Sequence, residues 1–320
     1  DLGDAKTLAH LLKYDSNYGI WSREVGNDEK HIIVDQKPYL VLQEKEPANL
    51  PWKDLGVDVV IESTGKFTDE AGAKLHLQAG AKKVIISAPA RNANSPDNAT
   101  SLRAGASVAG GPSKVKTFIL GVNAAKYSGE EIISNSSCTT NCIAPVAQVM
   151  HAKFGIVKAM MTTIHGYTHD QNLQDGPHKD LRRARAAAAN IVPTSTGAAI
   201  STTEVIPEFK GLFDGQALRV PVAVGSISDF TFLLKRKTTV EEINQVLKEA
   251  AAGELKGIMA VTEDPLVSSD IVGRSESAIV DLNLTQVVDG DMVKIFAWYD
   301  NEFGYSNRLI EQVINVGKSL

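Results

Sequence analysis

The sequence predicts an α/β protein in two parts, a parallel-sheet domain followed by an α+β domain with a mixed or antiparallel sheet. Its 320 residues are enough for about two domains. In the first half, short runs rich in Val and Ile alternate with helical segments, which is typical of a parallel sheet covered on both faces. In the second half, long strand-like runs follow one another with few helices between them, which favours a mixed or antiparallel sheet.

Charge and composition limit the classes of function. The net charge of −5 gives no reason to expect nucleic acid or an acidic membrane surface as a partner. No apolar run reaches the roughly 18 residues needed to span a bilayer, and the chain shows no signal-peptide pattern. Two cysteines in a chain of this length indicate a reducing compartment. We therefore expect a cytoplasmic protein that binds neither nucleic acid nor membrane.

The first half has a clear succession of strands. Its apolar runs are residues 57–64, 83–89, 117–122 and 131–134. Residues 68–79, between the first two runs, are helical in composition. In open parallel sheets, ligands bind beyond the carboxyl ends of the strands. Small polar residues stand at three of these strand ends, at 63–65, 87–89 and 137–139. The sequence therefore predicts one binding edge at which the three strand ends converge.

The second half has longer strands. Its strand-like runs are residues 157–165, 217–224, 228–234, 277–288 and 292–299. The clearest helix covers residues 239–252, and the last segment, 306–320, has apolar residues at helical spacing. Residues 90–114 are rich in Asn, Ser, Ala and Gly and lack periodicity. We predict a long connecting loop there and assign it no chemistry.

Cys138 is the most informative residue of the chain. The apolar run at 131–134 gives way to small hydroxyl and amide residues, and a helical segment follows at 142–150. Ser136 and Ser137 are good N-cap candidates, so the thiol lies near the start of a helix. Unpaired N–H groups and the helix dipole favour negative charge there, which predicts a thiolate nucleophile.

Other interpretations of Cys138 stay open on the sequence. Taken without its neighbours, a free cysteine is more often a small buried apolar residue. Together with Cys142 it could form half of a metal site, but no further ligands stand at short spacing, so we expect no metal. A disulfide between the two cysteines, inside one helical turn, would be strained.

Three further groups could complete a site around this thiol. His165 ends an apolar strand before a polar loop and is a candidate acid–base residue, although a strand-end histidine bonded to a backbone carbonyl is commoner. Arg219 stands alone among apolar neighbours and needs an anion, either an internal carboxylate or a ligand phosphate. The hydroxyl-rich run 194–199 precedes a helix, which suits a phosphate or an ordinary helix cap.

Several motifs stand in order along the chain. They are Ser-Asn-Ser-Ser-Cys-Thr-Thr-Asn-Cys at 134–142, Thr-Thr-Ile-His at 162–165, Pro-Thr-Ser-Thr-Gly-Ala-Ala at 193–199, Leu-Arg-Val-Pro at 218–221 and Trp-Tyr-Asp-Asn-Glu-Phe-Gly-Tyr-Ser-Asn-Arg at 298–308. This set resembles the phosphorylating glyceraldehyde-3-phosphate dehydrogenase family, from Asp1 to the C-terminus. The resemblance implies a Rossmann-type NAD-binding domain over residues 1–137, completed by a C-terminal helix at 304–320, and a catalytic domain over 138–303.

The resemblance also implies an activity and the residues that perform it. The family oxidises glyceraldehyde 3-phosphate, with NAD and inorganic phosphate, to 1,3-bisphosphoglycerate through a cysteine hemithioacetal and thioester in glycolysis and gluconeogenesis. Cys138 matches the nucleophile and His165 the acid–base residue. The residues that match two phosphate sites are Thr168, Arg183 and Arg219 for one, and Ser137, Thr139, Thr196 and Gly197 for the other. Those that match cofactor contacts are Asp1, Lys45, Thr64, Ser87, Asn301 and Tyr305. By resemblance we also expect a homotetramer.

The sequence departs from the family pattern in places. The family's glycine-rich strand–turn–helix belongs before Asp1, and we expect it to precede this residue in the complete protein. Lys45 stands where the family usually has Arg. Among enzymes, erythrose-4-phosphate dehydrogenase is the nearest alternative. A non-catalytic binding protein of the same fold and a cysteine hydrolase are the alternatives from other classes.

Overall fold

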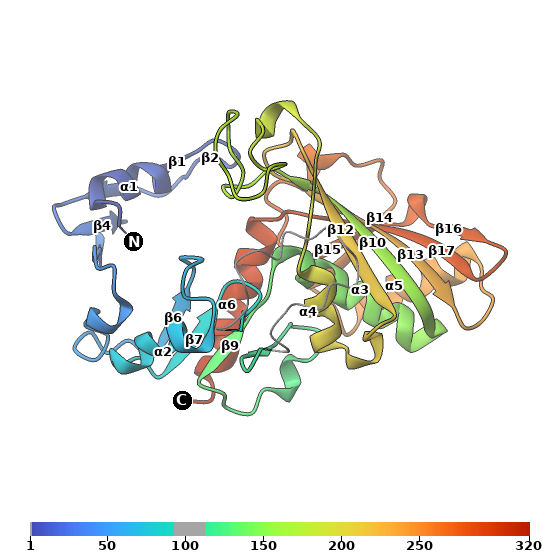
Figure 1. The fold of residues 1–320 in the computed structure, drawn as a ribbon, viewed down its shortest axis with the longest axis horizontal. Helices are drawn as coiled ribbons and strands as arrows, with labels where there is room; N and C mark the ends of the chain where they lie inside the picture. The colour runs from blue at the N-terminus through green and yellow to red at the C-terminus, as the bar shows by residue number, and fades with distance from the viewer. Residues whose placement is uncertain (1, 93–112) are drawn as a thin grey trace.

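The computed structural model describes residues 2–92 and 113–320. Asp1 and most of the predicted 90–114 loop therefore lie outside the described residues. Figure 1 shows two halves side by side, a smaller one that contains the N-terminal elements and a larger one built on a sheet of long strands. Within the described ranges, no helix has the length and apolar character needed to cross a membrane.

The described part of the chain begins with one helix and five short strands, and the sequence analysis predicted none of these strands. Helix α1 (Ala5–Lys13) is capped by Asp4, whose side chain accepts a hydrogen bond of 2.7 Å from the backbone N–H of Thr7. A two-stranded hairpin and a three-stranded antiparallel sheet follow, and α1 packs beside the latter. The strands are β1 (Tyr14–Asp15), β2 (Gly19–Ile20), β3 (Val25–Asn27), β4 (His31–Val34) and β5 (Lys37–Leu40).

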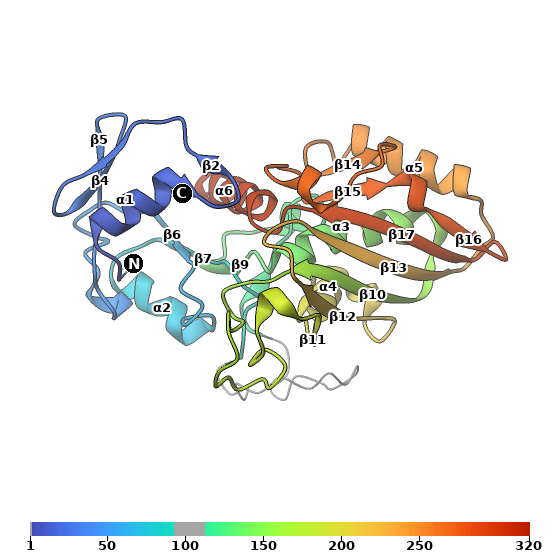
Figure 2. The same ribbon diagram turned by 90° about the horizontal axis from the view of Figure 1, so that it is seen from above.

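A parallel sheet in the order β6–β7–β9–β8 forms the core of the smaller half. Helices α2 (Glu70–Gln78) and α6 (Phe303–Gly317) lie on opposite sides of it, as Figure 2 shows. Along β7, Val84 and Ile86 pack in the cluster that contains α2 residues, whereas Ile85 packs with residues of α6. The predicted parallel sheet with both faces covered is confirmed. The strands are β6 (Val59–Glu62), β7 (Lys83–Ile86), β8 (Lys116–Thr117) and β9 (Ile132–Ser134).

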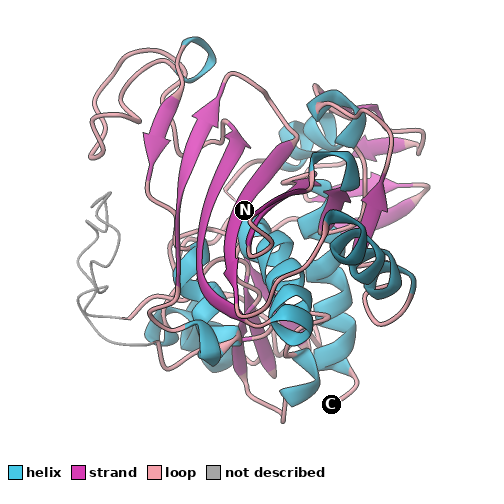
Figure 3. Cartoon of the chain, turned by 90° about the vertical axis from the view of Figure 1, so that its right-hand side faces the viewer, coloured by secondary structure: helices cyan, strands magenta, loops and turns pink. Residues whose placement is uncertain are grey.

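The larger half is built on one mixed sheet in the order β11–β12–β10–β13–β17–β15–β14, with β16 paired to β17. β10 pairs in parallel with β12 and antiparallel with β13. Buried and partly exposed residues alternate along β13, because helices cover one face of the sheet (Figure 3). The strands are β10 (Ile156–Gly166), β11 (Val192–Thr194), β12 (Phe213–Val220), β13 (Ser226–Leu234), β14 (Met259–Thr262), β15 (Ala278–Asp281), β16 (Gln286–Val288) and β17 (Met292–Tyr299). The helices are α3 (Cys138–Phe154), α4 (Ala198–Val205) and α5 (Val240–Ala252).

Two predicted strands are wrong in extent. The run at 117–122 yields only the end of β8, because the Asn123 side chain bonds the backbone of Thr117 (2.8 Å) and Ile119 (2.7 Å) and turns the chain. The run at 277–288 is divided into β15 and β16. There the Asp281 side chain accepts a hydrogen bond of 3.2 Å from Asn283 N–H and caps a short 3₁₀ turn between the strands.

Candidate active site

The carboxyl ends of the parallel strands lie level with one another. In the sheet register, Glu62 pairs with Ile86, and Ile86 pairs with Ser134. Beyond these residues, the backbone N–H of Ser87 donates a hydrogen bond of 3.0 Å to the Glu62 carbonyl. The loops that follow β6, β7 and β9 therefore leave the sheet at the same edge, which is where parallel sheets bind ligands.

Cys138 is the first residue of α3. The N-cap is Ser137, whose hydroxyl accepts a hydrogen bond of 3.1 Å from the Thr140 N–H. Ser136 has a positive φ of 54°, and its carbonyl accepts a hydrogen bond of 2.8 Å from the Tyr305 hydroxyl, so that α6 holds this turn. The thiol thus stands at a helix N-terminus, where free N–H groups favour negative charge on sulfur.

His165 places an imidazole against this thiol. It lies near the end of β10, is 4% exposed, and its Nε2 is 3.5 Å from Cys138 Sγ. Its Nδ1 lies 2.6 Å from the Gly166 carbonyl oxygen. Because a carbonyl oxygen can only accept, Nδ1 carries the ring proton and Nε2 presents a lone pair to the sulfur. The arrangement is a thiol with an adjacent proton acceptor.

Burial decides the charge state of this pair. Burial raises the pKa of the Cys138 thiol above its ordinary value, and the charge of Arg219 lowers it by less. Burial, followed by the charge of Arg219, lowers the pKa of His165 to about 3. Both shifts favour a neutral thiol beside a neutral imidazole. These directions run against the standing thiolate that the sequence predicted, and they favour a thiol whose proton Nε2 accepts as the sulfur reacts.

Tyr299 supports both members of the pair, and the sequence analysis assigned it no role. Its hydroxyl lies 2.9 Å from the Thr139 hydroxyl and 2.8 Å from the Thr163 hydroxyl. Its ring meets the His165 ring edge-on, with centroids 5.9 Å apart and planes at 73°. Tyr299 stands inside the motif at 298–308, but only the fold shows which rings and hydroxyls it contacts.

Strand register brings Arg219 beside His165. The two residues are direct neighbours on the parallel strands β12 and β10. Arg219 Nη1 donates a hydrogen bond of 2.6 Å to the Thr168 hydroxyl and one of 3.3 Å to the Gly166 carbonyl. The Gly166 carbonyl, which also accepts from His165, therefore links the guanidinium to the imidazole.

Asp170 completes this group, and sequence reasoning missed it. Its carboxylate accepts hydrogen bonds from the Thr168 hydroxyl and Arg183 Nη1 and lies 4.0 Å from Arg219 Nη1. Burial raises the pKa of Asp170, but Arg219, Thr168 and Arg183 together lower it by more than burial raises it. The pKa is therefore below its ordinary value, and the carboxylate stays ionised. We name Thr168, Asp170, Arg183 and Arg219 the anion cluster. Of the two partners that the sequence left open for Arg219, the structure places an internal carboxylate nearby.

The second predicted phosphate set is divided between two helix starts. Ser137 and Thr139 flank the thiol at the start of α3. Gly197 is the N-cap residue of α4, and the Thr196 hydroxyl accepts a hydrogen bond of 3.2 Å from the first N–H of that helix. A Cβ on Gly197 would lie 4.0 Å from Pro89 Cγ, so the start of α4 is close to the loop that follows β7. The phosphate-binding roles of these residues stay predictions.

Asn301 has a fixed side chain. It is 7% exposed, and its Oδ1 accepts hydrogen bonds from the Gly225 N–H (3.1 Å) and the Ser226 hydroxyl (2.8 Å). Its NH₂ group is therefore the end available to a ligand acceptor. Lys45 is exposed in the segment after β5, and no described contact joins it to the strand ends. The predicted cofactor contact at Asp1 lies outside the described residues.

Two family models match the chain. Residues 137–301 match the C-terminal domain of glyceraldehyde 3-phosphate dehydrogenase, and residues 1–70 match the NAD binding domain of the same enzyme. The chain belongs to the glyceraldehyde-3-phosphate dehydrogenase family. Among the curated family members it matches, those of Mycobacterium tuberculosis and Streptomyces coelicolor are 55% and 51% identical to it over 323 residues. The alignments cover 100% of this chain and 89% and 90% of the two relatives.

Family membership confirms the resemblance carried by the ordered motifs. It also confirms the predicted cofactor class, because the matched N-terminal model is an NAD binding domain. The C-terminal model begins at residue 137, next to the cysteine at the start of α3. The division into residues 1–137, 138–303 and 304–320 stays a prediction.

Proposed function

We propose that this protein oxidises glyceraldehyde 3-phosphate, with NAD and inorganic phosphate, to 1,3-bisphosphoglycerate in glycolysis and gluconeogenesis. The observation that carries the proposal is the 3.5 Å between Cys138 Sγ and the unprotonated Nε2 of His165, one strand away from Arg219. A nucleophile at the start of α3, with a base and a guanidinium on β10 and β12 beside it, supplies the groups that a phosphorylated aldehyde requires.

The chain's own residues can carry each proton. Cys138 attacks the aldehyde carbon, His165 Nε2 accepts the thiol proton, and the Cys138 N–H donates to the developing oxyanion. Nε2 returns the proton to that oxygen to give the hemithioacetal, and accepts it again as the carbon loses its hydride. A thioester on Cys138 remains. A phosphate oxygen then attacks its carbonyl, the C–S bond breaks, and the sulfur leaves as the acyl phosphate is released. One proton is released overall.

The described residues fit NAD, which supplies the hydride acceptor when bound. Asn301 presents an amide NH₂ whose orientation is fixed by two hydrogen bonds to its Oδ1. A carboxamide carbonyl is the acceptor that such a group recognises. Thr64 and Ser87 stand at the strand-end loops of the parallel sheet, and Tyr305 is bonded to the turn before Cys138. Together these positions support a dinucleotide along the carboxyl edge.

The test is a steady-state assay of NADH formation with glyceraldehyde 3-phosphate or erythrose 4-phosphate, each with and without phosphate. We expect the higher kcat/KM with glyceraldehyde 3-phosphate, and turnover that depends on phosphate. A higher kcat/KM with erythrose 4-phosphate would favour the alternative, erythrose-4-phosphate dehydrogenase. Absence of NADH with either sugar, together with a Cys138 no more reactive to iodoacetamide than a small thiol, would instead favour a non-catalytic protein.

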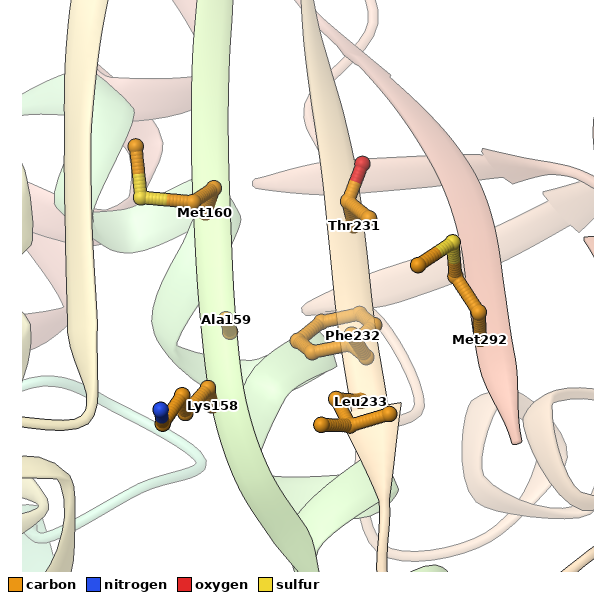
Figure 4. Close-up of a pocket in the computed structure, with 7 residues that line it drawn as sticks. All are labelled: Lys158, Ala159, Met160, Thr231, Phe232, Leu233 and Met292. Atoms are coloured by element: carbon orange, nitrogen blue, oxygen red, sulfur yellow. The ribbon is translucent and has the colours of Figure 1, made fainter.

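We further propose that the protein acts in the cytoplasm as a homotetramer. The open face of the large sheet has a shallow hollow of about 140 Å³ between β10, β13 and β17 (Figure 4). Met160 and Met292 line it and are 56% and 49% exposed. Exposed apolar side chains of this kind support packing against another copy of the chain. Sedimentation equilibrium measures the mass, and a monomer at working concentrations would contradict the proposal.

A further inference from the structure

A buried polar chain runs from Trp52 through His76 to Glu62, and the reaction proposed above does not use it. His76, on α2, is 5% exposed, and Glu62, at the end of β6, is 2% exposed. The Trp52 indole donates a hydrogen bond of 3.1 Å to His76 Nδ1, and His76 Nε2 lies 2.9 Å from Glu62 Oε2. The Trp52 and His76 rings are stacked, with centroids 6.3 Å apart and planes at 27°.

The protons in this chain follow from the chemistry of the groups. An indole N–H can only donate, so His76 Nδ1 must accept, and the ring proton is on Nε2. The imidazole is therefore neutral and donates to a Glu62 carboxylate. Burial raises the pKa of Glu62, but hydrogen bonds from His76 and Thr64 together lower it by more than burial raises it, so the carboxylate stays ionised. A buried carboxylate whose partners are neutral costs free energy unless its hydrogen bonds compensate.

The second carboxylate oxygen of Glu62 holds the loop at the carboxyl end of β6. Oε1 accepts a hydrogen bond of 2.7 Å from the Thr64 N–H and another from the Thr64 hydroxyl. The Thr64 oxygen in turn accepts a hydrogen bond of 3.1 Å from the Lys66 N–H, and Gly65 has a φ of 73°. The Thr64 hydroxyl is thus engaged within its own loop. A ligand at this edge meets a loop whose shape Glu62 sets.

We propose that Trp52, His76 and Glu62 are positioning residues that set the affinity for NAD by holding the 63–65 loop. The inference rests on the proposed cofactor edge at the ends of β6 and β7. It is supported by the backbone of Glu62, whose carbonyl also accepts a hydrogen bond of 3.0 Å from Ser87 N–H at the end of β7. No described contact joins this chain of side chains to the Cys138–His165 pair, so its effect falls on cofactor affinity and not on the chemical step.

Glu62→Gln and Trp52→Phe in the full-length protein test this inference. Glu62→Gln should raise the Kd for NAD about tenfold, the loss expected for one charge-assisted hydrogen bond. Trp52→Phe keeps an aromatic ring beside His76 but removes the indole N–H, and it should raise the Kd for NAD about threefold. In both variants, kcat at saturating NAD and the rate of Cys138 alkylation should stay within about twofold of wild type. Lys74→Gln, which removes an exposed ion pair with Glu70 on the same helix, is the control and should leave the Kd unchanged.

The outcomes separate this inference from the proposed function. An unchanged NAD Kd in both folded variants overturns the inference, as does a fall in kcat at saturating NAD without a change in Kd. If Glu62→Gln does not fold, Trp52→Phe decides. If the wild-type protein binds NAD but does not oxidise glyceraldehyde 3-phosphate, the proposed function fails, and the Kd values of the variants still test the inference.

Discussion

The Cys138–His165 pair and the anion cluster are neighbours, because His165 on β10 lies beside Arg219 on β12, but they differ in which of their polar groups are already hydrogen-bonded. In the pair, His165 Nδ1 is bonded to the Gly166 carbonyl, and the Nε2 lone pair is left for the sulfur. In the cluster, Thr168 and Arg183 already donate to the Asp170 carboxylate. Under the proposed function, the substrate meets a His165 Nε2 that is free to accept the thiol proton, whereas its phosphate competes with the Asp170 carboxylate for the donors of the anion cluster. Substitutions in the pair should act on kcat, and those in the cluster on binding.

The largest loss is expected from the nucleophile. Cys138→Ser should lower kcat by about 10⁴-fold or more, because an alcohol beside a neutral imidazole is a much poorer nucleophile than a thiol. The Kd for NAD should change little, since the exchange leaves the start of α3 in place. Turnover and NAD binding measured on the same preparation check both points. Substantial residual oxidation would refute the role assigned to Cys138.

The second-largest loss of kcat is expected from His165, the proposed base. His165→Asn should lower kcat by about 10²- to 10⁴-fold, the usual range for loss of a positioned general base. The affinity for phosphate should stay close to that of wild type, because the asparagine leaves Arg219 and Thr168 in place. Single-turnover kinetics with a phosphate titration measure the two effects separately. If the KM for phosphate changed while kcat did not, the assignment of His165 to the reacting pair would be wrong.

Arg219→Ala should act mainly through binding. Loss of one charge-assisted contact to a phosphate should raise the KM for glyceraldehyde 3-phosphate about 10- to 100-fold. Arg219→Lys is the matched variant, because it keeps the charge without the planar donors, and should recover only part of the affinity. An effect confined to kcat in both variants would erase the distinction between the pair and the cluster.

The same variant should shift the pH profile of the thiol. The charge of Arg219 lowers the pKa of Cys138, while burial raises it. Thiolate is the reactive form, so alkylation by iodoacetamide should speed up as the pH rises. Removal of the guanidinium raises the pKa further, so the Arg219→Ala profile should move to higher pH. A profile that is unmoved, or moved to lower pH, would show that Arg219 does not influence the sulfur.

The smallest change, with the opposite sign, is expected at Asp170. Asp170→Asn keeps an oxygen for Thr168 and Arg183 but removes the negative charge that competes with phosphate. The KM for glyceraldehyde 3-phosphate should fall by about two- to fivefold, as expected for one partly exposed charge interaction. The NADH assay checks this, with Asp175→Asn, an exposed partner of Arg185, as the control. A higher KM would mean that Asp170 organises the arginines for the ligand.

The sequence predicted the elements of the site better than their contacts. The serines before Cys138 and the apolar run before them are local signals, and they correctly place the thiol at the start of a helix. The parallel sheet was predictable for the same reason, since its runs are apolar on both faces. Strands β1, β2, β3 and β5 carry no such run, and β4 has only the three apolar residues at 32–34. The break between β15 and β16 depends on the single side chain of Asp281.

The contacts that the sequence could not predict join distant residues. Asp170 lies among arginines because the segment between β10 and β11 folds back on itself, with Asn172 N–H bonded to the Arg183 carbonyl, and the spacing of residues in the sequence does not predict this. The Tyr299 hydroxyl reaches Thr139 and Thr163 only because β17, α3 and β10 pack together. The directions in which the pKa values of Cys138 and His165 shift depend first on burial, which a local pattern of residues does not report.

Because His165 and Arg219 pair across adjacent strands, the backbone sets the distance between them. Neighbouring strands lie about 4.8 Å apart, and a slip of one residue would turn the side chains to the other face. The separation between the proton acceptor and the guanidinium is thus fixed by main-chain hydrogen bonds. An enzyme engineered for aldehydes with a longer carbon chain before the phosphate would need a new phosphate-binding residue in the loops. Arg219 cannot be moved away from His165 by shifting one strand, because such a shift would break the pairing of β10 with β12.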